Sequence, residues 1–320
     1  MNLVASNRAL SILYSFLDFH KNEGRYTVVI PSNICHDVFF LILHLKMQYI
    51  IVDIEADNLS IDRESVLNLL KTTDKIILLY NHTYGNTHTP YDFFKEIKCI
   101  SKESLIIDDR CLCLPSTQLL PVDNLIDLIL YSTGRSKQVD IGVNGFAFVN
   151  TSTQLFPVQI EFNYGSYGEL QRLFRSDINE LIGRKKLLSS CIHVLQNHSI
   201  DISEYMGTIE TNINEWSDHK KRIRHLYEKN LPLAVQLAAC FNNWRFSIRV
   251  EKKDIILSDL FRNKLFASSH YPSIGTKINN SKCGIANRLH DSVINLFIDK
   301  YYTEQMAFQT VRIINQCLAV

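Results

Sequence analysis

Short apolar runs alternate with amphipathic stretches of helical spacing along the first half of the chain. The apolar runs are rich in β-branched and aromatic residues, which favours buried strands. They cover residues 26–31, 49–57, 75–82, 104–109, 125–132 and 145–151. The amphipathic stretches cover residues 4–20, 33–46, 62–73 and 91–101, the third with Asp62 as its expected N-cap. Apolar strands joined by helices predict an α/β fold with a mostly parallel sheet covered by helices.

The second half of the chain has a different pattern. Helical patterns cover residues 167–198, 204–239, 255–265, 285–297 and 303–318, and one strand-like run covers residues 244–250. This arrangement predicts a smaller α+β domain. We therefore expect a large domain over residues 1–160, then a helical linker and a small C-terminal domain over residues 161–320.

The composition is that of an ordinary globular protein. Hydrophobic residues make up 46% and charged residues 21% of the 320 residues, and the formal net charge is +1. Because this charge is close to zero, nothing indicates nucleic acid or a membrane surface as a partner. No apolar run reaches the length of a membrane span, and the N-terminus lacks the pattern of a signal peptide. A cytoplasmic protein is therefore expected.

Eight cysteines are scattered along the chain. Only Cys111 and Cys113 lie close together, and no second close pair completes a zinc site, so no metal is predicted. A chain of this size does not need disulfides as staples, and we expect buried, reduced thiols.

Polar and reactive side chains follow the apolar runs at their carboxyl ends. In open parallel sheets, ligands bind beyond this edge. The segments concerned are residues 32–36, 81–86, 108–109 and 132–137. If these segments meet at the carboxyl edge of the sheet, they bring hydroxyl groups, an acidic pair and a single lysine together at this rim.

A lysine at such a rim is a nucleophile when its amine is unprotonated, and its usual product is a Schiff base with a carbonyl, including that of pyridoxal phosphate. This cofactor also needs a carboxylate for its pyridine nitrogen. Its phosphate needs hydroxyls and backbone N–H groups, ideally at a helix N-terminus. Asp109 is the natural carboxylate, and Ser132 and the Ser6-Asn7-Arg8 turn are natural phosphate contacts.

Each of these residues also fits a structural role when it is taken alone. Lys137 fits a solvated surface charge, Asp109 a helix cap or turn former, and Arg8 a surface ion pair. His82 fits a hydrogen-bonded structural histidine better than a general base. Only their joint arrival at one rim indicates a site.

The order and spacing of these segments resemble the sugar aminotransferases of the DegT/StrS group, a family of fold-type I pyridoxal-phosphate enzymes. The family shows a serine, then a lysine five residues on, then a glycine five further, which match Ser132, Lys137 and Gly142. Its strand end of an acid followed by an aspartate matches Asp108-Asp109. The likeness covers most of the chain.

The resemblance implies roles for particular residues. Lys137 would carry the cofactor as a Schiff base, and Asp109 would pair with the pyridinium. Cofactor contacts would come from Ser6, Asn7, Arg8, Cys35 and Ser132, and substrate contacts from His82, Tyr84, His270 and Tyr271. It also implies amino transfer, with glutamate as donor, to a nucleotide-linked keto-sugar for polysaccharide or secondary-metabolite biosynthesis, carried out by a homodimer.

The sequence departs from the family at several points. It starts almost at the first helix, without the family's N-terminal arm, so an N-terminally shortened member is expected. Val143 replaces a glutamate. The aromatic residue that would stack on the cofactor ring is not evident: Asn33 stands at the position of the family's tyrosine, and Cys35 or His36 is expected to face the ring instead. Asn163 matches an asparagine that reaches the partner's phosphate. Two other functions stay open: a non-catalytic scaffold, or a pyridoxal-phosphate enzyme of this fold acting on a small keto substrate without a nucleotide.

Overall fold

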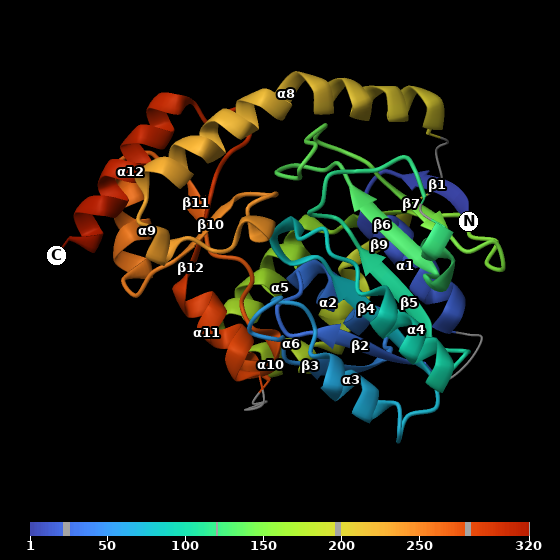
Figure 1. Cartoon of the computed structure of the whole chain (residues 1–320). Helices are drawn as coiled ribbons and strands as arrows, with labels where there is room; N and C mark the ends of the chain where they lie inside the picture. Colours follow the sequence, from blue (N-terminus) through green and yellow to red (C-terminus); the bar gives the residue numbers. More distant parts are fainter. Residues whose placement is uncertain (22–25, 120, 196–199, 279–282, 320) are drawn as a thin grey trace.

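A seven-stranded sheet forms the centre of the computed structural model (Figure 1), which describes residues 1–21, 26–119, 121–195, 200–278 and 283–319. β7 runs antiparallel to both of its neighbours, and the other neighbouring strands are parallel. The predicted α/β fold with a mostly parallel sheet is confirmed. In spatial order the strands are β1 (Asn2–Ser6), β7 (Gly145–Val149), β6 (Leu128–Ser132), β5 (Leu105–Asp109), β4 (Ile76–Asn81), β2 (Thr27–Pro31) and β3 (Gln48–Val52).

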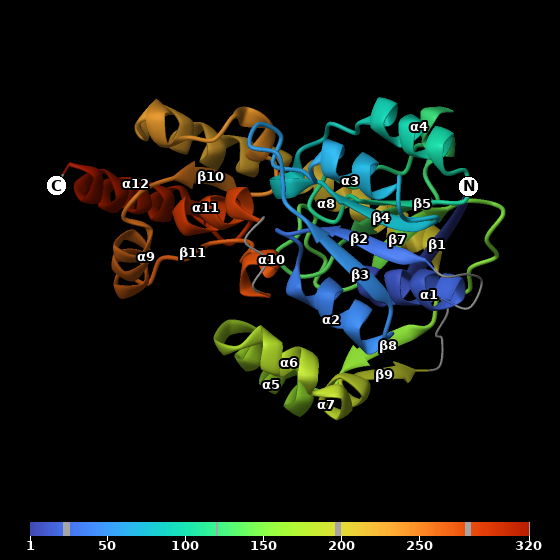
Figure 2. The ribbon, with the colours of Figure 1, turned by 90° about the horizontal axis from the view of Figure 1, so that it is seen from below.

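Helices cover both faces of this sheet, as Figure 2 shows. One face carries α1 (Ala9–Lys21), α2 (His36–His44), α5 (Tyr164–Ser176), α6 (Ile178–Gly183) and α7 (Lys185–Ser190), which share one apolar cluster. The other face carries α3 (Arg63–Leu69), α4 (Tyr91–Ile100) and the first turns of α8 (Ile202–Asn230). The expected cap of α3 is confirmed, because the Asp62 carboxylate accepts a hydrogen bond from the Ser65 backbone N–H at 3.0 Å.

The N-terminal segment differs from the prediction. Helical spacing over residues 4–20 predicts a helix from residue 4, but α1 begins only at Ala9 and the preceding residues form the edge strand β1. Every residue of β1 is paired with β7, with Ser6 opposite Gly145. Pairing with a strand far along the chain overrides the local spacing.

The pattern over residues 167–198 does not form one helix, and its last three residues lie outside the described part of the chain. It divides into α5, α6 and α7, and then forms β9 (Ile192–Leu195), which pairs with β8 (Gln159–Phe162). Asp177 causes the first break. Its carboxylate accepts hydrogen bonds from two backbone N–H groups at the start of α6, at 2.9 and 3.0 Å, and so begins a new helix.

Two later helical patterns also end early. α8 ends at Asn230 instead of continuing to residue 239, because Pro232 has no backbone N–H to extend it. The pattern over residues 285–297 forms α11 (Gly284–Ser292) and then β12 (Val293–Leu296), whose β-branched residues favour a strand.

A smaller antiparallel sheet lies in the C-terminal part of the chain. It contains β10 (Phe246–Arg249), β12 and β11 (Ala267–Ser268). These strands share an apolar cluster with α9 (Lys253–Arg262), α12 (Glu304–Leu318) and the last turns of α8. The remaining short helices are Thr83–Gly85, Pro121–Leu125, Leu233–Val235, Ala239–Phe241 and α10 (Ile274–Lys277).

α8 joins the two parts of the molecule (Figure 1). Its first turns pack on the large sheet through Tyr205 and Ile209, and its last turns pack in the C-terminal cluster. α5, α6 and α7 pack on the large sheet as well. The boundary at residue 160 stays a prediction, and this packing favours a boundary inside α8. No helix of the described residues is long and apolar enough to cross a membrane.

Gly145 brings the start of β7 against the start of α1. A Cβ at Gly145 would collide with the backbone N and Cα of Ala9, which cannot rotate away as a side chain can. We expect Gly145→Ala to lower the free energy of unfolding by about 1–3 kcal/mol, measured by urea denaturation. Gly168 in α5 is the control, because a Cβ there meets nothing within 4 Å. Equal stability of the two alanine variants would contradict the prediction.

Candidate active site

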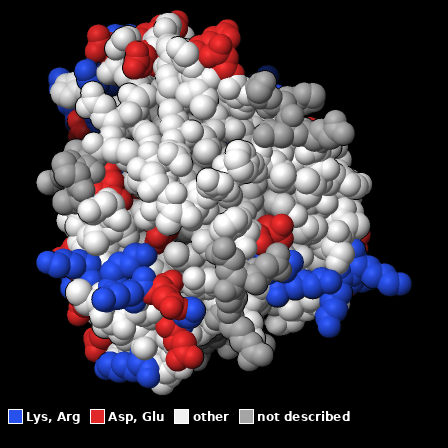
Figure 3. Space-filling model, turned by 90° about the vertical axis from the view of Figure 1, so that its right-hand side faces the viewer, with Lys and Arg blue, Asp and Glu red and all other residues white. Residues whose placement is uncertain are grey.

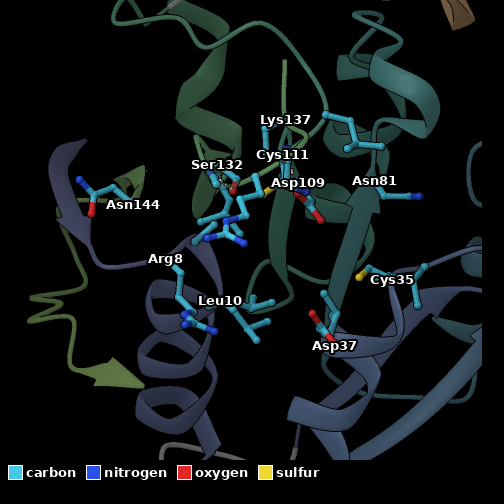
Figure 4. Close-up of a pocket in the computed structure, with 18 of the residues that line it drawn as sticks. Arg8, Leu10, Cys35, Asp37, Asn81, Asp109, Cys111, Ser132, Lys137 and Asn144 are labelled. Atoms are coloured by element: carbon cyan, nitrogen blue, oxygen red, sulfur yellow. Dashed lines mark hydrogen bonds between the residues drawn. The ribbon is translucent and has the colours of Figure 1, made fainter. Parts of the chain in front are cut away.

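The carboxyl ends of β4, β5 and β6 and the start of α1 surround a cavity of about 440 Å³ (Figure 4). Asp109, Cys111 and Lys137 lie close together in it, and Arg8 stands at the start of α1. This is the rim at which the sequence predicted a site. The predicted site residues that line the cavity are Asn7, Arg8, Cys35, His82, Asp109, Ser132, Lys137 and Tyr271.

The other predicted residues lie behind the wall of the cavity. The Ser6 hydroxyl donates to the Val158 carbonyl at 3.1 Å, and the Tyr84 hydroxyl donates to the His270 carbonyl. The His270 ring lies 5.4 Å from the ring centroid of Trp244. Burial, together with nearby cations, lowers the pKa of His270 to about 3, so its ring is neutral. Direct cofactor or substrate contacts from these three residues therefore stay predictions without support from the cavity geometry.

Asn163 also lies away from the cavity. Its side chain caps α5 by accepting a hydrogen bond from the Ser166 backbone N–H at 3.1 Å. A structural role explains its position.

Lys137 stands in a tight turn after β6. Ser136 has a positive φ of 61°, and its N–H donates to the Asp140 carboxylate at 2.7 Å, which closes the turn. The Lys137 side chain is half-buried, and its amine makes no hydrogen bond or ion pair with the described residues. A half-buried amine without a partner can react with a carbonyl in the cavity.

Asp109 ends β5 and lines the cavity. Its Oδ1 accepts a hydrogen bond from the Cys111 backbone N–H at 3.0 Å, and its carboxylate is also hydrogen-bonded to the Cys111 side chain. Asn81 is opposite Asp109 in the sheet register and also lines the cavity. The Asn81 amide oxygen is buried and has no hydrogen-bond partner among the described residues. From the sequence, Asn81 was expected among the residues at the strand ends, but no function was assigned to it. Its position as the last residue of a strand was the signal that could have indicated one.

Two thiols, those of Cys35 and Cys111, line the cavity. Burial, with the nearby Asp37 carboxylate, raises the pKa of Cys35 to about 12. Burial and the Asp109 carboxylate also raise the pKa of Cys111 well above its usual value. Both thiols are therefore neutral near pH 7 and are not activated nucleophiles. The His36 ring packs against Phe174 and does not line the cavity, so of the two residues expected near the cofactor ring only Cys35 lines it.

A buried ionic network stands beside Asp109. The Asp108 carboxylate lies 2.6 Å from His82 Nε2 and 2.7 Å from Arg110 Nε. His82 Nδ1 lies 2.5 Å from the Asn86 carbonyl oxygen. Both His82 nitrogens therefore face acceptors, which requires a protonated ring. These contacts agree with the hydrogen-bonded structural role expected for His82, which also lines the cavity.

The pKa shifts in this network follow from its charges. Burial by itself lowers the pKa of His82, but the Asp108 carboxylate and Cys113 together outweigh it and raise that pKa well above the usual value. Burial by itself raises the pKa of Asp108, but His82 and Arg110 outweigh it and lower that pKa. The His82 contribution to stability is lost as pH rises through its raised pKa. The Asp108 contribution is lost as pH falls through its lowered pKa, so the network is strongest around neutral pH.

We expect Asp108→Asn to lower the free energy of unfolding by about 3–5 kcal/mol, because it leaves His82 and Arg110 as buried cations without their anion. Urea denaturation at pH 7 measures this loss. Asp127→Asn is the control: the Asp127 carboxylate pairs with Lys98 at 2.7 Å but is less deeply buried, so a smaller loss is expected. If Asp108→Asn lowers the free energy of unfolding by less than about 1 kcal/mol, the ionic network contributes little to the stability of the end of β5.

The phosphate-binding features predicted from the sequence lie at one end of the cavity. Arg8 is half-buried at the start of α1 and makes no ion pair with the described residues. The Ser132 hydroxyl accepts a hydrogen bond from the Gly134 N–H at 3.4 Å, which leaves its own proton for a ligand. A helix N-terminus with a cation and a hydroxyl beside it favours an anion such as phosphate.

The donor set fits pyridoxal phosphate. The Lys137 amine, the Asp109 carboxylate, the Ser132 hydroxyl and Arg8 at the start of α1 line one cavity. The Asn81 amide oxygen, which has no partner among the described residues, adds a polar group for a ligand donor. Metal-ligating clusters of three or more His, Cys, Asp or Glu side chains are absent from the described residues.

Solved structures share this fold, although the chain matches no protein-family model and no curated protein. The sugar aminotransferase CalS13 from Micromonospora echinospora is 15% identical with a TM-score of 0.67, over 98% of this chain and 87% of that one. A DegT DnrJ EryC1 StrS aminotransferase from Brucella abortus is 14% identical with a TM-score of 0.67, over 99% and 86%. DesV from S. venezuelae, solved with a ketimine intermediate, is 14% identical with a TM-score of 0.67, over 98% and 84%. The chain therefore has the fold of sugar aminotransferases of the DegT/StrS type.

Proposed function

We propose that this chain is a pyridoxal-phosphate-dependent aminotransferase that aminates a keto-sugar, in the form linked to a nucleotide. The observation that carries the proposal is the meeting of Lys137, Asp109 and Ser132 with the start of α1 in one cavity. The fold shared with sugar aminotransferases supports it. Glutamate as amino donor, and a place in polysaccharide or secondary-metabolite biosynthesis, complete the proposal by resemblance to that family.

Pyridoxal phosphate, when bound, supplies an aldehyde and a pyridine ring that accepts electrons. In this cavity Lys137 would bond to the aldehyde carbon, and Asp109 would hold the proton on the pyridine nitrogen. Ser132, Arg8 and the first N–H groups of α1 would hold the phosphate. Cys35 would lie against the ring as a neutral contact.

Lys137 has two successive tasks in the reaction. It would hold the cofactor, and once released by the donor's amine it would be free to move a proton. The Lys137 amine would then act as general base at the donor's α-carbon and as general acid afterwards. The Asp109 carboxylate would stabilise a positive pyridine nitrogen, and its effect is greatest where water is excluded.

A spectroscopic experiment tests the cofactor part. Purified protein with added pyridoxal phosphate should develop a visible absorption band, and borohydride should bleach it and leave the cofactor attached to Lys137 in peptide mass spectra. Glutamate should remove the band and release 2-oxoglutarate. No attachment at Lys137 would contradict the proposal and leave the non-catalytic scaffold as the better interpretation.

A substrate comparison tests the substrate class. Nucleotide-linked keto-sugars, free keto-sugars and small keto acids would be offered to the glutamate-treated enzyme, and the return of the visible band would be followed. Fastest return with a nucleotide-linked keto-sugar supports the proposal. Fastest return with a small keto acid would favour the alternative without a nucleotide.

We include a homodimer in the proposal. The face of the molecule drawn in Figure 3 has a broad region with few charged side chains, with Lys and Arg gathered mainly near its lower margin. A largely uncharged face of this kind suits contact with a second copy. Sedimentation equilibrium should give twice the chain mass, and a monomer at micromolar concentration would contradict this part.

A further inference from the structure

Three side chains from the second half of the chain donate hydrogen bonds to the turn that carries Lys137. Trp244 Nε1 donates to the Ser136 carbonyl at 2.6 Å. Lys220 Nζ donates to the Gln138 carbonyl, and Lys300 Nζ donates to the Asp140 carbonyl at 3.3 Å. The three acceptors are alternate carbonyls of one short segment, the first just before Lys137 and the second just after it.

The three donors come from separate places in the C-terminal half. Lys220 lies in the middle of α8, Trp244 just before β10, and Lys300 after β12. Trp244 is itself fixed, because it is only 6% exposed and the Arg245 guanidinium lies 4.2 Å from its ring centroid. Its backbone N–H donates to the Tyr84 carbonyl at 3.2 Å, next to the strand ends of the large sheet.

Within the turn, the Ser136 N–H donates to the Asp140 carboxylate at 2.7 Å. The Lys137 N–H donates to the Gly134 carbonyl at 3.3 Å and the Ile141 N–H to the Thr133 carbonyl at 3.0 Å. None of these bonds uses the Ser136, Gln138 or Asp140 carbonyl. The outside donors therefore hold the carbonyl side of the Ser136–Lys137 peptide, and with it they influence the direction of the Lys137 side chain.

The charged groups around Lys220 indicate that its hydrogen bond to the Gln138 carbonyl is a fixed feature of the fold. Lys220 and Lys300 share a small cavity of about 20 Å³ with Lys137, and its other charged groups are Asp140 and Asp299. Burial lowers the pKa of Lys220 to about 8, against the opposing effect of Asp299 and Asp140. The half-buried Lys220 side chain ends in an amine that donates to the Gln138 carbonyl.

We propose that Trp244, Lys220 and Lys300 are positioning residues: the C-terminal half of the chain holds alternate carbonyls of the Lys137 turn and so aims the reactive amine into the cavity. The inference rests on the proposed function for the role of Lys137. The hydrogen bonds from the three donors to the turn do not depend on that function. A shift of the C-terminal half would move the three donors together and change the presentation of Lys137.

Two single variants remove donors with little change of shape. Trp244→Phe keeps a buried ring and removes the N–H, and Lys220→Met keeps the chain length and removes the amine. Trp216→Phe and Lys221→Met are the matched controls. They lie on α8 near the same turn, and neither side chain donates to it within the described residues.

The first readout is hydrogen exchange of the turn in protein without added cofactor. Loss of one donor should speed exchange of the Lys137 and Ile141 amides by about tenfold, because each such hydrogen bond contributes modestly to closing the turn. The controls should exchange as wild type does. Unchanged exchange in both donor variants, or equal acceleration in the controls, would overturn the proposal.

The second readout separates aiming from general destabilisation. The attachment of pyridoxal phosphate to Lys137, followed as growth of the visible band, should slow by about tenfold in the donor variants. Affinity for pyridoxamine 5′-phosphate, which has no aldehyde for Lys137, should stay within about twofold. Parallel losses in both measurements would overturn the positioning role. If wild type attaches no cofactor, the proposed function fails, while the exchange measurement still decides whether the turn is held.

Discussion

Lys137→Ala is expected to abolish amino transfer, a loss of at least about 10⁴-fold in kcat, because one amine serves both to hold the cofactor and to move the proton. The fold should be unaffected. The Lys137 side chain is half-buried and has no partner among the described residues, so the free energy of unfolding should change by less than about 0.5 kcal/mol. Turnover with glutamate, borohydride attachment and urea denaturation measure the three quantities.

Lys221→Ala is the matched control, since this lysine is exposed and, among the described residues, pairs only with Asp218 on its own helix. It should keep full activity and full attachment. Amino transfer that survives in Lys137→Ala at more than a few per cent of wild type would remove the mechanism, whatever the spectrum shows.

Asp109→Asn should lower kcat by about 10²–10³-fold, because a neutral amide cannot keep the pyridine nitrogen protonated. The amide oxygen can still accept the hydrogen bond from the Cys111 N–H, so the turn after β5 should stay in place. Cofactor attachment at Lys137 should persist. Steady-state kinetics with glutamate measures the loss, and near-normal turnover would show that another group holds that proton.

The comparison with the neighbouring carboxylate sharpens this test. Asp108 and Asp109 point to opposite sides of β5, since successive side chains of a strand alternate. Asp108 is bonded to His82 and Arg110, whereas Asp109 lines the cavity. Asp108→Asn should therefore lose stability and Asp109→Asn activity. The reverse pattern would mean that the two acids have been assigned to the wrong roles.

The alternation of apolar runs and amphipathic stretches was enough to predict the architecture of the first half. A buried strand must be apolar throughout, and a helix that covers a sheet must be apolar on one side. Both patterns can be recognised from residues that are neighbours in the sequence. The site followed from the same pattern. Ends of parallel strands meet at one edge, which brings Asp109, Ser132 and Lys137 together.

Other features of the fold and the site depend on contacts between residues that are distant in the chain, and only the tertiary structure decided them. Residues 2–6 form a strand because β7 lies beside them. The partners of Asp108, which are His82 and Arg110, also come from the packed structure. Asp177 and Pro232 end helices for local reasons, which helical spacing alone does not show.

The donors to the Lys137 turn were equally beyond the sequence. Trp244, Lys220 and Lys300 have no shared spacing, and they reach one turn because α8 joins the large sheet to the C-terminal cluster. The sequence by itself therefore determined the fold class and indicated the candidate site residues, because periodicity and strand order are local. Which side chains hold those residues in place was decided only by contacts between distant segments.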